Sequence, residues 1–485
     1  MIINFLKKRI NNPSILDLLH NSIIYLVGNG LIAALAFFGS SILTRFIPPE
    51  DYAIISLLES YKSIFICLVT FNTYTALGRY LYEDTDDKKV FFGTLFIFSF
   101  SLILLFQGIT IFFLDFFSDL YDLPTRATLL IAPMLLIFLL SSLYEQFFIP
   151  KRKSKKIIIR KVIYHYLSFG LSLYLAQRFL DEKYLGYLYG LIGAGFIFGL
   201  VYFIELYKYI EFKFNFKHLN YMLSYSLPLL PYTLSGVILA QFDKIMINNI
   251  TGKLDTGLYS FASNVGMIIP LLNSSFALAW MPSYYKFMEE KDSKSLVNEF
   301  SIILRLLFLA SVGLLFFGKE VITILSPTKY HGAVDALPSI IFSFFIYIIF
   351  TYYSWIFSFL KRNSFLSMIV LCGGIINIYL NSVFIPIYGY IAAAYTTIVS
   401  YVIMLMSSYF LTRYYFKSFY FPMNVNLLYI IFFLFLGLAF PLINELFEER
   451  LLIFYSIKIL LLSLVILLCY LEYKFSIIIR NYKVL

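Results

Sequence analysis

The chain has 485 residues, of which 60% are hydrophobic, 20% aromatic and only 14% charged. Charged side chains normally make up about a quarter of a soluble domain. This composition therefore excludes a soluble enzyme, a disulfide-stabilised secreted protein and a disordered chain. The three cysteines and four histidines are scattered singly, a spacing that predicts neither a metal site nor a cofactor. We therefore expect an integral membrane protein.

Apolar runs predict where the chain spans the membrane. A spanning helix needs about 20 predominantly apolar residues, and windows of about 19 residues find about fourteen such segments. The loops between them are short, so we expect an all-α polytopic membrane protein without a separate extramembrane domain. The expected spans are 21–45, 53–77, 91–114, 127–149, 157–177, 185–205, 223–249, 257–280, 299–317, 336–360, 364–385, 389–411, 424–444 and 451–472.

Basic residues are concentrated in alternate loops. The loops at 78–90 and 150–161 are basic, as are the segments before the first span and after the last. Because cytoplasmic loops carry an excess of Lys and Arg, we expect both termini in the cytoplasm and assign most of the net charge of +10 to topology. The densest run, Lys151-Arg152-Lys153-Ser154-Lys155-Lys156, fits attraction to anionic lipids or capture of an anionic substrate.

Short motifs lie at the span boundaries. Pro228 and Pro231 open the seventh span and free backbone carbonyls there, so we expect a hinge or kink against protein or a water-filled cavity. In chain order the motifs are Leu43-Thr44-Arg45, Pro49-Glu50, Gly78-Arg79-Tyr80, Leu227-Pro228, Asp243-Lys244 and Gly389-Tyr390.

Taken in order, these motifs resemble those of the Wzx-like polysaccharide flippases, the O-antigen transporters of the multidrug/oligosaccharidyl-lipid/polysaccharide (MOP) exporter superfamily. The resemblance covers residues 20 to about 410. The chain departs from the family pattern at Ala53, where a glycine is usual, and at Lys244, where an arginine is usual. It keeps the positive charge at Lys244 but not the bidentate geometry of arginine.

The resemblance implies a fold of two six-helix lobes, at 1–210 and 211–417, that form a V-shaped central cavity. Residues 418–485 would add two further spans and a cytoplasmic tail. It also implies a function, which is to flip a lipid pyrophosphate-linked oligosaccharide across the bacterial cytoplasmic (inner) membrane by alternating access. The implied partners are an undecaprenyl-pyrophosphate-type substrate, membrane lipids, and a polysaccharide polymerase with chain-length machinery. No nucleic acid is expected.

Ionisable residues inside spans are costly and usually face the protein interior or water. Lys62 and Glu59 share one helix face in the second span. They form either a structural ion pair or a cavity cation with a tuning carboxylate. Asp243 is a second coupling or ion-pair candidate, and Lys458 in the last span is expected to snorkel to the interface. The candidates for binding an anionic substrate are Lys62, Lys244, Arg79, Arg45 and Arg305.

Asparagines inside the spans need hydrogen-bond partners, which are either neighbouring helices or sugar hydroxyls. They are Asn29, Asn264, Asn273, Asn377 and Asn381.

Three other functions share this composition, one of which is an accessory scaffold for surface-polymer assembly. A cation-coupled multidrug exporter of the same superfamily would have the same fold but an unpaired acid deep in an early span. A membrane polymerase or glycosyltransferase would need large outer loops, whereas the expected outer loops are short. Protons, sodium and the membrane potential all stay open as the driving force.

Overall fold

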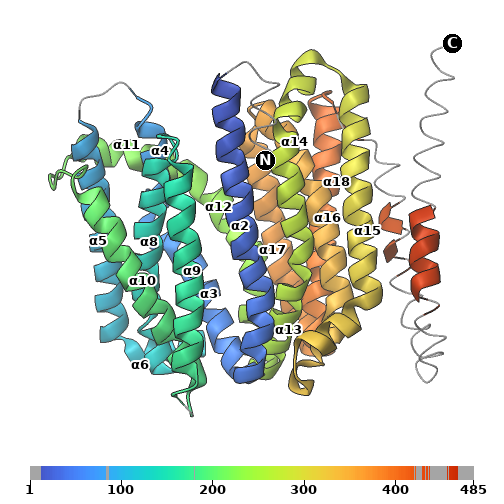
Figure 1. The fold of residues 1–485 in the computed structure, drawn as a ribbon, viewed down its shortest axis with the longest axis horizontal. Coiled ribbons are helices and arrows are strands. Elements are labelled where there is room, and N and C mark those ends of the chain that lie inside the picture. Colours follow the sequence, from blue (N-terminus) through green and yellow to red (C-terminus); the bar gives the residue numbers. More distant parts are fainter. Residues whose placement is uncertain are drawn as a thin grey trace. The chain divides into compact units, whose positions relative to one another are not determined.

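The computed structural model describes residues 13–83, 87–179 and 181–419, and beyond these 421, 429–431, 433, 434, 436, 456 and 458–467. Every regular element of this part is helical. Contacts divide the chain into two compact units, Met1–Ser260 (unit 1) and Phe261–Leu485 (unit 2) (Figure 1). The expected all-α fold is therefore confirmed.

Unit 1 is built around α3, which packs against α5, α8, α10 and α12, while α9 packs against α2 and α10. Pro49 opens α3, where its missing N–H is not needed, and the 3₁₀ turn η1 separates α11 from α12. The helices are α2 (Pro13–Phe46), α3 (Pro49–Thr70), α4 (Thr75–Tyr80), α5 (Lys88–Phe112), α6 (Leu114–Tyr121), α7 (Thr125–Thr128), α8 (Ile131–Phe148), α9 (Ser154–Ala176), α10 (Lys183–Tyr207), α11 (Phe216–Ser226), η1 (Leu227–Leu229), α12 (Leu230–Thr251) and the start of α13 (Lys253–Gly266).

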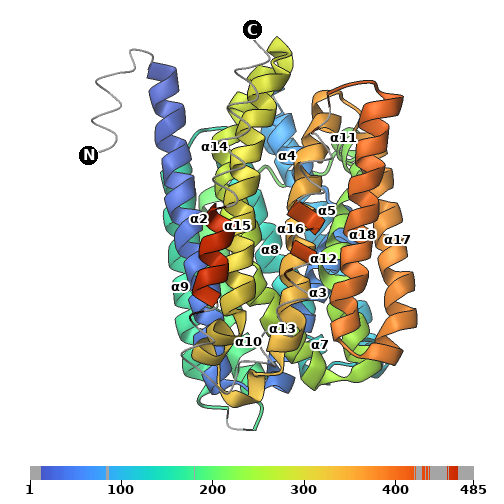
Figure 2. The same ribbon diagram turned by 90° about the vertical axis from the view of Figure 1, so that its right-hand side faces the viewer.

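Unit 2 places α16 at its centre, in contact with α14, α15, α17 and α18. Figure 2 shows α17 beside α18, where buried asparagines join the two helices. Asn377 donates to the Thr397 hydroxyl at 3.1 Å and accepts from Asn381 at 3.3 Å, which confirms the expected role of these asparagines. The elements are α14 (Ile268–Glu290), α15 (Ser293–Leu325), η2 (Thr328–Tyr330), α16 (Ala333–Phe359), α17 (Asn363–Tyr388), α18 (Ile391–Phe410) and the π-helical turn η3 (Leu411–Tyr415).

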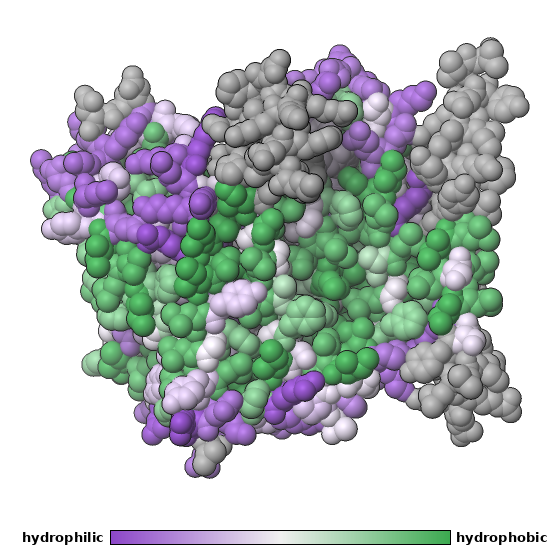
Figure 3. Space-filling view, in the orientation of Figure 1, coloured by the Kyte–Doolittle hydropathy of each residue, from purple (hydrophilic) through white to green (hydrophobic). Residues whose placement is uncertain are grey.

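In the described part, 11 helices are long and apolar enough to cross a membrane. Within each unit, apolar side chains cover the middle of the helices and polar ones gather toward their ends (Figure 3). Large apolar side chains face outward in the middle of these helices, such as Leu105 of α5 at 59% exposure and Phe196 of α10 at 61%. Lipid chains rather than water cover such a surface, so this is a multi-pass membrane protein.

The expected count of about fourteen spans is not reached among the described residues. The segment expected at 157–177 is helical as α9, but basic residues in its first turns keep it outside the 11. The spans expected at 424–444 and 451–472 lie largely outside the described residues. The expected lobe boundaries at 210 and 417 stay predictions. Unit 1 extends to residue 260 because α12 packs against α3 and Gly257 of α13 lies against Pro49.

Candidate functional site

A polar network joins α3 and α12 inside unit 1. On α3, Lys62 forms an ion pair with Glu59, and Ser60 donates to the Gln241 amide oxygen on α12 at 3.0 Å. Lys244, one turn after Gln241, donates to the same oxygen at 3.2 Å. We call Glu59, Ser60, Lys62, Gln241 and Lys244 the α3–α12 network. Glu59 and Lys62 on α3, and Gln241 and Lys244 on α12, are each three residues apart, so each pair lies on one helix face. Two helices far apart in sequence are therefore joined by one set of polar side chains.

Residues of α9 and α10 complete the surroundings of the network. His165 on α9 interacts electrostatically with both Lys62 and Glu59. Tyr187 on α10 lies within electrostatic range of Glu59 as well. Sequence reasoning treated His165 as an isolated histidine, although an ionisable residue inside an expected span was a usable signal. Glu59 is therefore surrounded by groups from α3, α9, α10 and α12.

Lys244 differs from Lys62 in how its charge is balanced. Glu59 and Asp243 interact with Lys244 electrostatically, but within the described residues no carboxylate forms an ion pair with it. Asp243 turns to another side of α12, is 5% exposed and accepts the Tyr259 hydroxyl at 2.9 Å. A lysine held by one neutral amide oxygen keeps donors available for an anion. Lys244 is thus the least neutralised cation of the network.

The other predicted substrate contacts do not join this network. Arg45 is exposed at the last turn of α2, and Arg79 is exposed at the end of α4 with its guanidinium 5.1 Å from the centre of the Tyr225 ring. Arg305 belongs to unit 2, where it is 8% exposed and donates to the Tyr429 hydroxyl at 3.2 Å. The structure therefore brings together Lys62, Lys244 and Glu59 but leaves Arg45 and Arg79 apart from them.

The predicted hinge lies where the two prolines stand. Pro228 is in η1 and Pro231 is in the first turn of α12. In a regular α-helix the Pro231 position would donate an N–H to the Leu227 carbonyl, which proline cannot do. The Leu230 N–H bonds to that carbonyl instead and closes the 3₁₀ turn. The Thr233 hydroxyl donates to the next carbonyls, those of Leu229 and Leu230, at 3.3 and 3.1 Å.

Some side chains of the basic run between α8 and α9 contact acidic and aromatic residues of neighbouring helices. Lys156 forms an ion pair with Glu205 at 2.6 Å, and the Lys151 ammonium lies 3.5 Å from the centre of the Phe147 ring. Burial lowers the pKa of Lys151, and the like charges of neighbouring lysines, Lys208 first, lower it further. These contacts fix Lys151 and Lys156 against α8 and α10.

Lys458 corrects one expectation. It is fully buried rather than snorkelling, and it pairs with Glu320 on α15. The partner carboxylate explains the difference, because a charge leaves the interface only where an opposite charge and hydrogen bonds receive it.

Comparison with known proteins gives a family and a fold. The model of the family "Polysaccharide biosynthesis protein" matches residues 18–288. Protein 1 of the Lsg locus of Haemophilus influenzae is 22% identical over 292 residues, which are 56% of this chain and 67% of that protein.

Solved transporters share the fold. An inward closed conformation of the lipid II flippase MurJ matches with a TM-score of 0.70 at 16% identity, over 95% of this chain and 99% of its own. An inward-facing multidrug resistance MATE transporter of the MOP superfamily matches with a TM-score of 0.58 at 15% identity, over 80% of this chain and 97% of its own. An outward-facing MATE transporter of the same superfamily matches with a TM-score of 0.57 at 15% identity, over 83% of this chain and 96% of its own. The chain belongs to the polysaccharide biosynthesis protein family and has the fold of MOP-superfamily transporters.

Proposed function

We propose that this protein flips a lipid pyrophosphate-linked oligosaccharide from the inner to the outer leaflet of the bacterial cytoplasmic membrane for surface polysaccharide assembly. The family and the fold shared with a lipid II flippase support a lipid-linked substrate. The sugar-lipid would be of the undecaprenyl-pyrophosphate type, as in O-antigen synthesis. Both termini would lie in the cytoplasm.

The observation that carries this proposal is the partly neutralised α3–α12 network. A pyrophosphate diester carries about two negative charges, and moving it across the hydrocarbon requires polar partners. Lys244 offers ammonium donors while its amide partner Gln241 is neutral, and the Lys62–Glu59 pair beside it can exchange one carboxylate for a phosphate. The polyprenyl tail would stay in lipid while the head group meets these residues.

The membrane potential supplies a direction for such transport. Moving one elementary charge across 100 mV changes its free energy by about 2.3 kcal/mol. At an inside-negative potential of about 100 mV, moving two negative charges outward would thus lower their free energy by roughly 4–5 kcal/mol. We propose this gain as a driving force that needs no cofactor, with alternating access as the mechanism. Proton or sodium coupling would add to it through Glu59 or Asp243.

Cation-coupled drug export is the second candidate, because multidrug transporters share the fold. The early acid of this chain is Glu59, and it is paired with a lysine. A paired acid suits an organic cation less well than a free one. We therefore rank an anionic substrate first, and regard a polymerase or chain-length protein as a further partner of the pathway.

The test is translocation in proteoliposomes that contain a purified polyprenyl-pyrophosphate oligosaccharide. Appearance of its sugars outside, measured as accessibility to an added glycosidase, is expected to speed up when the exit side is made positive. Export of an organic cation with no sugar translocation would reject the proposal in favour of drug export. In cells, deletion is expected to leave the lipid-linked sugar on the cytoplasmic leaflet.

A further inference from the structure

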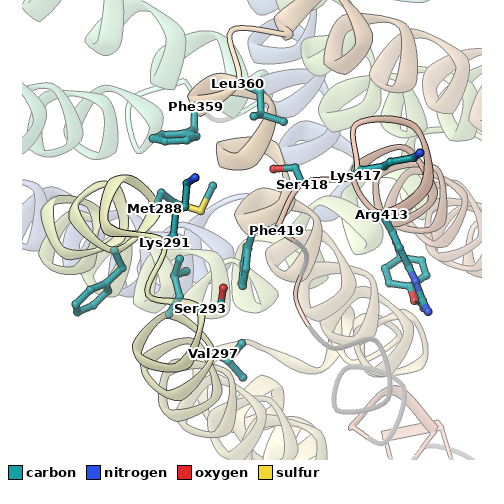
Figure 4. Close-up of a pocket in the computed structure, with 13 residues that line it drawn as sticks. Met288, Lys291, Ser293, Val297, Phe359, Leu360, Arg413, Lys417, Ser418 and Phe419 are labelled. Carbon is teal, nitrogen blue, oxygen red and sulfur yellow. Dashed lines mark hydrogen bonds between the residues drawn. The ribbon is translucent and has the colours of Figure 1, made fainter.

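Unit 2 contains a pocket that is separate from the α3–α12 network. It has a volume of about 990 Å³ and lies where α14 and α16 end and α15 begins, beside the last turns of α18 and η3 (Figure 4). These helix ends lead into basic loops, which the charge distribution assigns to the cytoplasmic face. The pocket is thus placed at a membrane surface rather than in mid-membrane.

The pocket has a cationic rim. Lys291, Arg413 and Lys417 line it and are exposed, and no carboxylate is among its lining residues. Of the acids that adjoin Lys291 in sequence, Asp292 accepts from the Ser295 backbone N–H at 3.0 Å and caps α15, and Glu290 lies 3.9 Å from Lys286. Because the lining carries three cationic side chains and no carboxylate, its charge favours an anion.

The walls of the pocket are apolar. They include Phe287, Phe359 and Phe419 together with Met288 and Leu296. Figure 4 shows Phe419 in the middle of the view, across from Met288 and Lys291, with Lys417 and Arg413 on the far side of it. A small hydrophilic anion would leave these rings uncovered. The lining therefore fits a molecule that joins an anionic group to hydrocarbon.

Two of the rim lysines stand where helix geometry favours glycine. Lys291 has φ 56° at the end of α14, and Lys417 has φ 48° just after η3. Helices that end in this left-handed conformation usually use Gly or Asn there. Lys361 ends α16 in the same way at φ 57° but does not line the pocket. The helix dipole favours a cation in a last turn, yet it does not account for the adjoining aromatic wall.

We propose that this pocket binds the phosphate-bearing head group of a membrane lipid, with the rim cations on the phosphate and the aromatic wall on the first carbons of the tail. The same chemistry is offered by an anionic phospholipid and by a polyprenyl pyrophosphate. The site goes beyond the proposed function, because a phospholipid would occupy it whether or not the protein flips sugars.

Binding to the full-length protein in neutral detergent tests this directly. The probes are dihexanoyl phosphatidylglycerol and farnesyl pyrophosphate, with dihexanoyl phosphatidylcholine and inorganic pyrophosphate as comparisons. We expect one or both amphipathic anions to bind, and which one binds identifies the source. Equal binding of inorganic pyrophosphate, or equal binding of the zwitterionic lipid, would overturn the proposal.

Variants assign the binding to the pocket. Each basic residue near an anionic head group contributes about a fivefold change in binding, so Lys291→Gln/Arg413→Gln/Lys417→Gln should weaken it by well over about tenfold. All three side chains are exposed, so the variant is expected to fold.

The matched control is Lys286→Gln/Lys294→Gln/Lys361→Gln, which removes the same charge from exposed residues of the same unit outside the pocket. This control variant should bind both amphipathic anions as the unaltered protein does. Phe419→Ala should weaken the binding of both amphipathic anions, because it removes part of the aromatic wall. An equal loss in the control, or no loss in the pocket variant, would refute the site. Sugar translocation is measured in a separate assay, so an absence of translocation would not change the conclusion about lipid binding in this pocket.

Discussion

The buried pair between Lys458 and Glu320 predicts that a single substitution destabilises unit 2 strongly. Lys458 is 0% exposed and Glu320 is 18% exposed at their side chains. Lys458→Met keeps the length of the side chain but leaves the Glu320 carboxylate without its cation. Removing one partner of a buried pair typically costs about 3–5 kcal/mol.

We therefore expect Lys458→Met to lower the free energy of unfolding by about 3–5 kcal/mol. Unfolding in mixed detergent micelles, compared with the unaltered protein, gives this difference.

A second variant separates lost charge balance from lost packing. Lys458→Met/Glu320→Gln removes both charges, so most of the lost stability should return. Lys294→Met, which removes an exposed charge of the same unit, should change little. If Lys458→Met costs no more than Lys294→Met, or if the double variant is no more stable than the single one, the ion-pair reasoning is refuted.

Two further predictions concern helix contacts and helix capping. Gly257→Val should destabilise unit 1 by about 1–3 kcal/mol, because an added Cβ would stand 2.0 Å from the Pro49 carbonyl oxygen. Thermal unfolding measures this loss, with Gly236→Ala as the control, since a Cβ at that position meets no atom within 4 Å. Equal stability of the two variants would contradict the contact. Hydrogen bonds from Ser295 hold the pKa of Asp292 below its usual value, so its capping contribution is complete above pH 3.8 and is lost as the pH falls through the lowered pKa. The protection factor of the Ser295 amide, which is its exchange rate relative to an unstructured peptide at the same pH, should fall only in that acid range. A fall of the protection factor already near pH 6 would disprove the cap.

Hydropathy predicted the helices well because the bilayer imposes a length and an apolar composition on each span. The segments expected at 336–360 and 364–385 correspond to α16 and α17 within a few residues at each end. The prolines at 228 and 231 marked the η1 interruption, because their backbone chemistry is local. Features encoded by neighbouring residues were thus predictable.

Contacts between helices were not predictable in the same way. Ser60 and Gln241 are 181 residues apart, and Lys458 and Glu320 are 138 apart. Hydropathy gives the depth of a side chain and periodicity gives its face, but neither says which helix that face meets. For this reason Lys458 was expected at the interface, although it pairs with Glu320, and His165 was left out of the site, although it interacts electrostatically with Lys62 and Glu59.

The initial rate of sugar-lipid translocation by network variants in proteoliposomes shows whether the α3–α12 network binds the anionic head group. Lys62→Met/Lys244→Met is expected to slow translocation at least about tenfold, as the loss of about 1.4 kcal/mol or more of anion stabilisation requires. Lys244→Arg should retain most of the rate because it keeps the charge, and Lys286→Met/Lys294→Met should behave as the unaltered protein. A Lys62→Met/Lys244→Met protein that is folded and translocates at the full rate would contradict the claim that this network carries the anionic head group.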